Sequence, residues 1–244
     1  MALFEALIEL ADDHLVLGHR LSEWCGHAPM LEEDLALPNM ALDLIGTART
    51  LYAYAGTVEG KGRSEDDLAY LRGEREYRNC LLAERPNEDF AQTMLRQFYF
   101  AVFMERYWQA ALDSPDDVVR GVAGKAVKEM AYHIRHSGEW VIRLGDGTDE
   151  SARRMRAAVA DLHLYTGELF EAGASADIAA LPDRGALRES WDATVAQVFA
   201  EAYLEVPDIP YPQTGGRAGL HDETLGHMLA EMQSVHRAHP GATW

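Results

Sequence analysis

The sequence predicts an all-α protein whose centre is a long four-helix bundle. Apolar residues recur at helical spacing in several long segments, and no stretch shows the alternation of apolar and polar residues that marks a half-buried strand. The breaks between the segments carry turn residues and helix-capping residues. Four segments are about 25 residues long, which suits the helices of a long bundle.

The first two bundle helices are expected over residues 4–24 and about 32–56. Apolar side chains of the first segment form a band too broad for a single face, so we expect this helix to be covered on two sides. The turn that follows contains Gly26 and Pro29, which favour the end of a helix. Pro38 is expected to kink the early turns of the second helix.

A shorter crossover helix and the third bundle helix are expected next. Ser64 is followed by three acidic residues and is a typical N-cap, and the crossover helix that it opens is expected to end near Pro86. Asn87 is expected to cap the third bundle helix, which runs to about Leu112. The inward stripe of that helix is apolar except for one amide, Gln97.

The fourth bundle helix is expected to be capped by Ser114, with Pro115 at its first position, and to end at Gly145. The remaining elements are a helix over 148–173, a surface loop over 174–183, a sixth helix over 184–204, an extended segment over 206–220 and a last helix over 222–237. Together they predict a single ferritin-like domain over residues 1–244, in which residues 205–244 form an extended segment and a C-terminal helix packed on the bundle.

The net charge and the two cysteines argue against nucleic-acid binding, membrane binding, a disulfide framework and a zinc site. Acidic residues outnumber basic ones by 40 to 22, giving a formal charge of -18, which disfavours binding to nucleic acid or to an anionic membrane. The acidic excess serves either solubility or complementarity to a basic subunit or reductase. Cys25 and Cys80 form neither a disulfide framework nor a zinc motif. With no leader-like start and no apolar run of roughly 20 residues, a soluble, cytoplasmic protein is expected.

The inward stripes of the bundle carry polar residues where a metal centre would lie. Di-iron bundles use one Glu from each of two helices and a Glu-x-x-His pair from each of the other two, and no Glu-x-x-His occurs in this sequence. Asp43 is followed three residues later by Gly46, and Glu129 by Tyr132. We therefore expect a remnant polar core without metal, with no catalytic residue, made of Asp12, Asp43, Gln97, Glu129, Tyr132 and His133. In this core Tyr132 is expected to hydrogen-bond the retained acid Glu129 and to fill the space of an iron.

Several segments are more specific than any bundle pattern. They are LSEWCGHAP at 21–29, EDLAL at 33–37, LDLIG at 42–46, residues 128–129 with 132–133, 144–145 with 147–148, 214–216 with 219–221, and MLAEMQ at 228–233. In these segments the chain resembles the C subunits of bacterial phenylacetyl-CoA epoxidases, the monooxygenases of phenylacetate catabolism. The resemblance covers essentially the whole chain.

The resemblance implies a ferritin-like fold and a non-catalytic subunit that carries no cofactor. It implies that a catalytic A subunit holds the di-iron centre, that a reductase subunit supplies electrons, and that this chain pairs with and supports the A subunit. It also implies that phenylacetyl-CoA lies near the subunit boundary. Two stretches would then lie near this substrate: Glu76, Tyr77, Arg78 and Asn79 on the crossover helix, and Asp177, Ile178 and Ala179 in the loop. The alternative for both stretches is a solvated helix and loop.

Two other functions stay open at this point. One is a stand-alone di-iron oxygenase that uses Asp12, Asp43, Glu129 and His133 as unusual ligands. The other is a module that binds a CoA thioester without chemistry. Other epoxidase subunits are further possible partners, and the isolated chain is a possible homodimer.

Overall fold

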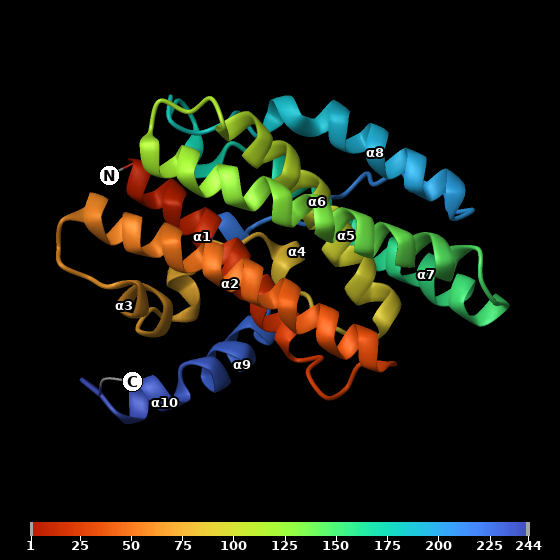
Figure 1. Ribbon diagram of the computed structural model, residues 1–244, viewed down its shortest axis with the longest axis horizontal. Helices are drawn as coiled ribbons and strands as arrows, with labels where there is room; N and C mark the ends of the chain where they lie inside the picture. The colour runs from red at the N-terminus through yellow and green to blue at the C-terminus, as the bar shows by residue number, and fades with distance from the viewer. Residues whose placement is uncertain (1, 243–244) are drawn as a thin grey trace.

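The computed structural model describes residues 2–242, and within that range it is helical without strands, which confirms the all-α prediction. Four long helices form the bundle: α1 (Ala2–Ser22), α2 (Leu31–Glu59), α5 (Phe90–Ala111) and α6 (Asp117–Gly145) (Figure 1). Shorter α-helices complete the chain: α3 (Glu65–Tyr70), α4 (Leu81–Glu84), α7 (Asp149–Leu162), α8 (Arg188–Glu201), α9 (Glu223–Met232) and α10 (Ser234–Ala238). Short 3-10 helices lie between them: η1 (Glu74–Glu76), η2 (His163–Phe170), η3 (Gly173–Ser175), η4 (Gly185–Leu187) and η5 (Gly216–Ala218).

The bundle consists of two helix pairs. Helix α1 packs along α2 and α5 packs along α6, while α2 and α6 bring the two pairs together on one side. On the other side the pairs meet through large rings, because His14 of α1 lies 5.4 Å from Phe100 and 5.8 Å from Trp108 of α5. Helices α7 and α8 cover α5, and α4 and η3 cover α1. The broad apolar band of the first segment is explained by this cover on two sides.

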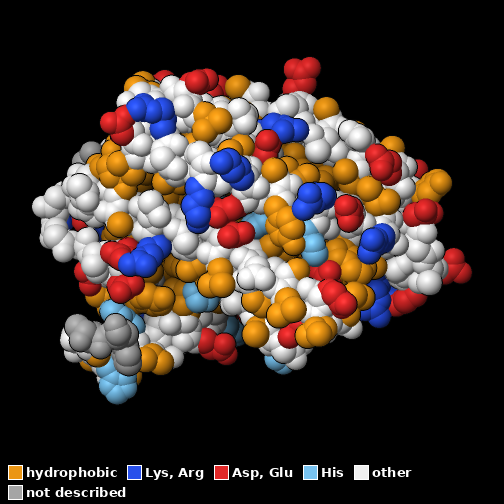
Figure 2. Space-filling model, in the orientation of Figure 1, with side chains coloured by type: hydrophobic (Ala, Val, Ile, Leu, Met, Phe, Trp, Pro, Cys, Tyr) orange, Lys and Arg blue, Asp and Glu red, His pale blue; other side chains and the backbone are white. Residues whose placement is uncertain are grey.

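The surface over α2 and α6 differs from the rest of the bundle. Apolar side chains there reach the surface among charged side chains of both signs (Figure 2). Helix α1, in contrast, is buried almost continuously from Ala6 to Leu21. No helix within residues 2–242 is long and apolar enough to cross a membrane.

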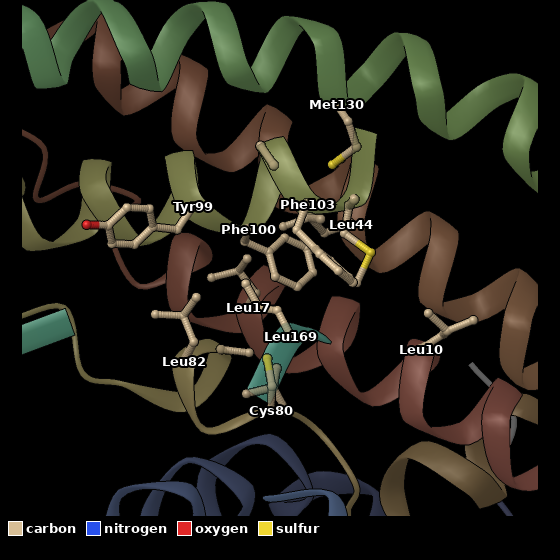
Figure 3. Close-up of a cluster of buried hydrophobic side chains, with 14 of the residues drawn as sticks. Leu10, Leu17, Leu44, Cys80, Leu82, Tyr99, Phe100, Phe103, Met130 and Leu169 are labelled. Atoms are coloured by element: carbon tan, nitrogen blue, oxygen red, sulfur yellow. The ribbon is translucent and has the colours of Figure 1, made fainter. Parts of the chain in front are cut away.

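The apolar core lies between the four long helices and is closed by segments from outside the bundle. Phe100 and Phe103 of α5, Leu17 of α1 and Leu44 of α2 meet in its centre (Figure 3). From the connection between α2 and α5, side chains including Cys80 reach the same cluster. Burial raises the pKa of the Cys80 thiol well above its ordinary value, so this cysteine acts as a packed apolar group.

The predicted cap Ser64 is confirmed, and the helices expected to start at Thr148 and Asp222 are capped by these two residues. Ser64 forms a capping box with Asp67, Thr148 accepts a hydrogen bond from the Ser151 amide, and Asp222 accepts one from the Thr224 amide. Pro38 lies inside α2, as expected.

Two predicted caps are wrong. The N-cap of α5 is Asp89 instead of Asn87, because the Asn87 amide donates to the Arg20 carbonyl (2.8 Å) and so ties two distant segments together. The N-cap of α6 is Asp116, whose carboxylate accepts from the amides of residues 118 and 119. Ser114 instead donates to the Ala180 carbonyl at 2.7 Å.

The continuous crossover helix over 64–86 is also wrong. Helix α3 ends at Tyr70, and residues 77–80 are extended before the single turn of α4. Buried carboxylates capture the backbone amides that a helix would have used: Asp12 accepts from the Arg78 amide, Asp13 from the Cys80 amide and Glu168 from the Leu81 amide, each at 2.7 Å. An amide bonded to a distant carboxylate cannot close a helical turn.

The later helices are shorter than predicted. The helix that starts after Thr148 keeps α-geometry only to Leu162 and continues as 3-10 turns to Phe170. The sixth helix begins at Arg188 and ends at Glu201 instead of spanning 184–204.

Gly145→Ala is expected to destabilise the fold by about 1–3 kcal/mol. A Cβ atom at Gly145 would stand 2.3 Å from the Ala202 carbonyl oxygen, where the end of α6 meets the end of α8. Gly121→Ala on the same helix is the matched control, since its Cβ would meet nothing within 4 Å. This control should gain up to about 1 kcal/mol from helix propensity. Urea unfolding of the two variants checks the prediction, and equal midpoints would contradict it.

Candidate functional site

A chain of three polar side chains crosses the centre of the bundle and links α5, α6 and α2. The Gln97 side-chain amide lies 3.0 Å from His133 Nδ1, and His133 Nε2 lies 3.2 Å from an Asp43 carboxylate oxygen. With Gln97 donating to Nδ1, the ring proton of His133 sits on Nε2 and is donated to Asp43. This hydrogen bond holds the pKa of Asp43 below its ordinary value. Three residues of the predicted polar core therefore lie together.

Glu129 lies beside this chain and Tyr132 does not. Glu129 is half-buried and pairs with Lys125 at 2.9 Å, one turn back on α6. Tyr132 is 40% exposed, and its ring stacks on His136. The expectation that Tyr132 hydrogen-bonds Glu129 inside the core is wrong. One residue of helix rotates a side chain by about 100°, so the neighbour of buried His133 points outward.

Asp12 belongs to a different cluster, on the side of α1 that faces the connection between α2 and α5. It is fully buried, accepts hydrogen bonds from the Tyr52 hydroxyl and the Arg78 amide, and forms an ion pair with Arg72. Burial disfavours the charge of Arg72, but Asp12 outweighs this effect and raises the pKa of the guanidinium. Asp12 is thus neutralised by arginine and does not contribute to the polar chain around His133.

Helix α1 carries two more buried acids with arginine partners, and sequence reasoning missed both. Asp13 forms a two-pronged pair with Arg217 (2.8 Å for each prong), and Glu9 lies 3.0 Å from Arg184. The three arginines on Glu9, Asp12 and Asp13 come from three separate segments. The only signal in the sequence was the run of acids inside an apolar helix, which indicates buried partners without naming them.

The two stretches that the resemblance placed near substrate differ in exposure. Glu76 ends the short helix η1, and residues 77–79 are extended instead of helical. Tyr77 and Asn79 are fully buried, so neither is a solvated residue. Arg78 lines a cavity of about 450 Å³ with Glu9, while a second cavity of about 460 Å³ is lined by Asp177, Ile178 and Ala179 of the loop together with Arg184.

His14 is a buried histidine that no pattern in the sequence singles out. It lies in the apolar band of α1, is fully buried, and its Nδ1 lies 2.7 Å from the Leu10 carbonyl oxygen. Because a carbonyl can only accept, the Nδ1 proton is donated to it. Burial lowers the pKa of His14 from 6.5 to about 4.

Lowering the pH should destabilise the protein through His14. Its pKa is lower when folded than when unfolded, so the unfolded state binds more protons between pH 6.5 and about 4 and stability falls with falling pH. The contribution between pH 7 and pH 5 is about 2 kcal/mol. Burial lowers the pKa of His163 to about 4 as well, which adds an effect of the same sign. Urea unfolding at both pH values should show a smaller loss for His14→Gln than for the unmodified chain; equal losses would contradict the assignment.

The residues at the bundle centre do not fit a di-iron centre. Both ring nitrogens of His133 are engaged, Gln97 offers a neutral amide, and Glu129 is paired with a lysine. Two ferrous ions need several carboxylates and imidazole to balance their charge. Within residues 2–242 no three His, Cys, Asp or Glu side chains are grouped so that they could hold a metal ion.

Comparison with known proteins agrees with the architecture. The family model of phenylacetic acid catabolic proteins matches residues 1–244. The chain is also 45% identical over 243 residues to the C subunit of the 1,2-phenylacetyl-CoA epoxidase of Escherichia coli (strain K12), an alignment that covers 97% of each chain. The resemblance read from the sequence motifs is confirmed by this likeness.

Proposed function

The chain belongs to the family of phenylacetic acid catabolic proteins, and we propose that it is a non-catalytic subunit of a phenylacetyl-CoA epoxidase in phenylacetate catabolism. In this proposal it pairs with a catalytic subunit of similar fold and supports that subunit's structure. The di-iron centre belongs to the catalytic subunit, and this chain carries no cofactor of its own.

The observation that carries the proposal is that both ring nitrogens of His133 are hydrogen-bonded to protein side chains. This histidine is the fully buried imidazole on α6 nearest to Asp43 and Glu129, and its two ring nitrogens are taken by Gln97 and Asp43. A metal ligand needs one ring nitrogen free of a proton and facing the ion. The polar side chains inside the bundle therefore link its helices through hydrogen bonds. In this proposal the activation of oxygen takes place in the catalytic subunit.

Metal analysis of the purified chain tests the non-catalytic role. After expression in iron-rich medium the chain is expected to hold far less than one iron per molecule, while the catalytic subunit prepared in parallel serves as the positive control. Two irons per chain would contradict the proposal and favour the stand-alone oxygenase.

Co-purification tests the pairing. A tagged copy of this chain is expected to retain the catalytic subunit at low salt, and the pair is expected to turn over phenylacetyl-CoA with a reductase. Turnover by this chain and the reductase without the catalytic subunit would contradict the assigned role.

A further inference from the structure

The bundle is covered unevenly. Helices α1 and α5 are enclosed by α4, η3, α7 and α8. Helix α2 contacts α3, and α6 contacts α7 and α8, but exposed side chains remain along the outward side of both helices within residues 2–242. Each of these two helices has 29 residues and is thus about 43 Å long. Two adjacent helices of this length offer enough surface for a stable interface of about 800 Å² on each partner.

Large apolar side chains project from this uncovered side. Leu35 and Leu42, seven residues apart on α2, are 60% and 66% exposed, and Tyr132 of α6 lies on the same side. Helical spacing places Leu35, Asn39, Leu42 and Gly46 of α2 and Lys125, Lys128, Tyr132 and Arg135 of α6 on one outward surface. We call these eight residues the α2/α6 face.

The eight residues of the α2/α6 face carry three basic side chains and no acidic one, although the exposed Glu139 and the half-buried Asp43 and Glu129 lie beside them. The protein has a formal charge of -18, yet two of its three lysines, Lys125 and Lys128, lie here beside Arg135. Lys125 is partly neutralised by Glu129, and Arg135 lies over the Tyr132 ring at 5.4 Å. Lys128 is exposed, and no ion pair to it is found within residues 2–242. An apolar centre with a basic rim on an acidic molecule suits a partner whose surface is apolar in the middle and acidic around it.

Hydrogen bonds between buried and partly buried side chains of α2 and α6 fix the two helices that form the α2/α6 face relative to each other. Glu33 of α2 accepts hydrogen bonds from His136 (2.8 Å) and Trp140 (2.9 Å) of α6, and Asp43 accepts one from His133 (3.2 Å). These cross-links hold the two helices in one register. Gly46 on α2 and Gly121 on α6 add no side chain to this side: a Cβ atom at Gly121 would meet nothing within 4 Å, and one at Gly46 would stand 3.7 Å from Lys125 Nζ.

We propose that the α2/α6 face is the docking surface for the catalytic subunit, which presents an apolar helical surface with an acidic rim. This inference rests on the proposed function. A second copy of this chain fits less well, because a symmetric contact through the same face would bring the basic side chains of the two α6 helices toward each other.

Affinity measurements with the purified catalytic subunit test the inference. Two variants change the α2/α6 face: Leu42→Arg, and the double variant Lys128→Glu with Arg135→Glu. Both replace exposed side chains, so the fold should be kept, which circular dichroism and the melting temperature verify. Each is expected to raise the Kd at least about 30-fold, since a like charge or a buried charge at an interface is strongly unfavourable.

Matched controls lie elsewhere on the surface. Val235→Arg on α10, like Leu42→Arg, replaces an exposed aliphatic side chain with arginine, and Arg153→Glu on α7 reverses an exposed charge. Both are expected to change the Kd by less than about threefold. Raising the salt concentration should weaken binding of the unmodified chain more than binding of the double variant, because the variant has lost the attraction that salt screens.

The binding results distinguish a failure of the proposed function from a failure of the proposed docking surface. If the unmodified chain does not bind the catalytic subunit, the proposed function fails and this inference fails with it. If the unmodified chain binds and the α2/α6 variants bind equally well, this inference alone is overturned. Sedimentation of the isolated chain provides the remaining outcome: if Leu42→Arg dissociates a homodimer and leaves the Kd for the catalytic subunit unchanged, the face belongs to a second copy and the inference is wrong.

Discussion

Replacing Arg217 with Met is expected to lower the free energy of unfolding by about 3–5 kcal/mol. The side chain of Arg217 is only 6% exposed and pairs with Asp13, and its guanidinium also donates to the Arg78 carbonyl at 2.9 Å. Burial opposes the charge of Arg217, but Asp13 raises the pKa of the guanidinium above its ordinary value. Removing the arginine leaves a fully buried carboxylate without its counter-charge, which costs more than the loss of one hydrogen bond.

The Arg217→Met experiment has an internal check. Arg153 forms an exposed pair with Glu150 on α7 (2.8 Å), so Arg153→Met should leave the unfolding midpoint nearly unchanged. Adding Asp13→Asn to Arg217→Met should recover part of the loss, since the double variant no longer buries an unpaired charge. Chemical unfolding of the four chains measures these differences. A loss for Arg217→Met no larger than for Arg153→Met would show that the pair does not stabilise the fold.

Trp191→Ala is expected to cost about 3–5 kcal/mol. Trp191 is the fully buried anchor of α8, and its indole N–H donates to the Tyr99 carbonyl of α5 at 3.0 Å. Its ring lies 5.4 Å from the Tyr99 ring and 5.5 Å from the Phe170 ring. Truncation removes these contacts and leaves a cavity between α5, α8 and η2. The melting temperature should fall, and α8 should exchange its amide protons faster than α6.

Leu42→Ala provides the control for Trp191→Ala. Leu42 is a large apolar residue that is mostly exposed on α2, so its truncation should change stability by less than about 0.5 kcal/mol. This control also separates the two roles of apolar residues in the chain, because Leu42 is proposed to serve the partner and Trp191 serves the fold. A destabilisation by Leu42→Ala comparable to that by Trp191→Ala would contradict this division.

Local patterns predicted the long helices and several of their ends. The caps at Ser64, Thr148 and Asp222 bond amides two or three residues away, so the necessary information lies in a short stretch of sequence. Asn87 and Ser114 look equally suitable as caps, but their side chains bond carbonyls 67 and 66 residues away. Such partners are set by tertiary packing, which a local pattern does not contain.

The candidate site was predictable only in part for the same reason. His133, Gln97 and Asp43 were placed correctly in the polar core because each falls on the inward stripe of its helix. Asp12 lies in a stretch of α1 that is buried all round, so helical spacing alone does not predict which neighbour its side chain contacts. The contact is with Arg72, which lies in the segment where the predicted continuous crossover helix is interrupted.

The buried acids of α1 impose an order on folding during synthesis. The counter-charge of Asp13, Arg217, is added 204 residues after it. Until the ribosome has released this arginine, α1 holds a carboxylate that is costly to bury, so the bundle cannot close fully around its own first helix. The arginines that neutralise Asp12 and Glu9, at positions 72 and 184, are made earlier. Full burial of Asp13 therefore has to await Arg217, and a chain that lacks this arginine cannot close the bundle around α1 without burying an unpaired carboxylate.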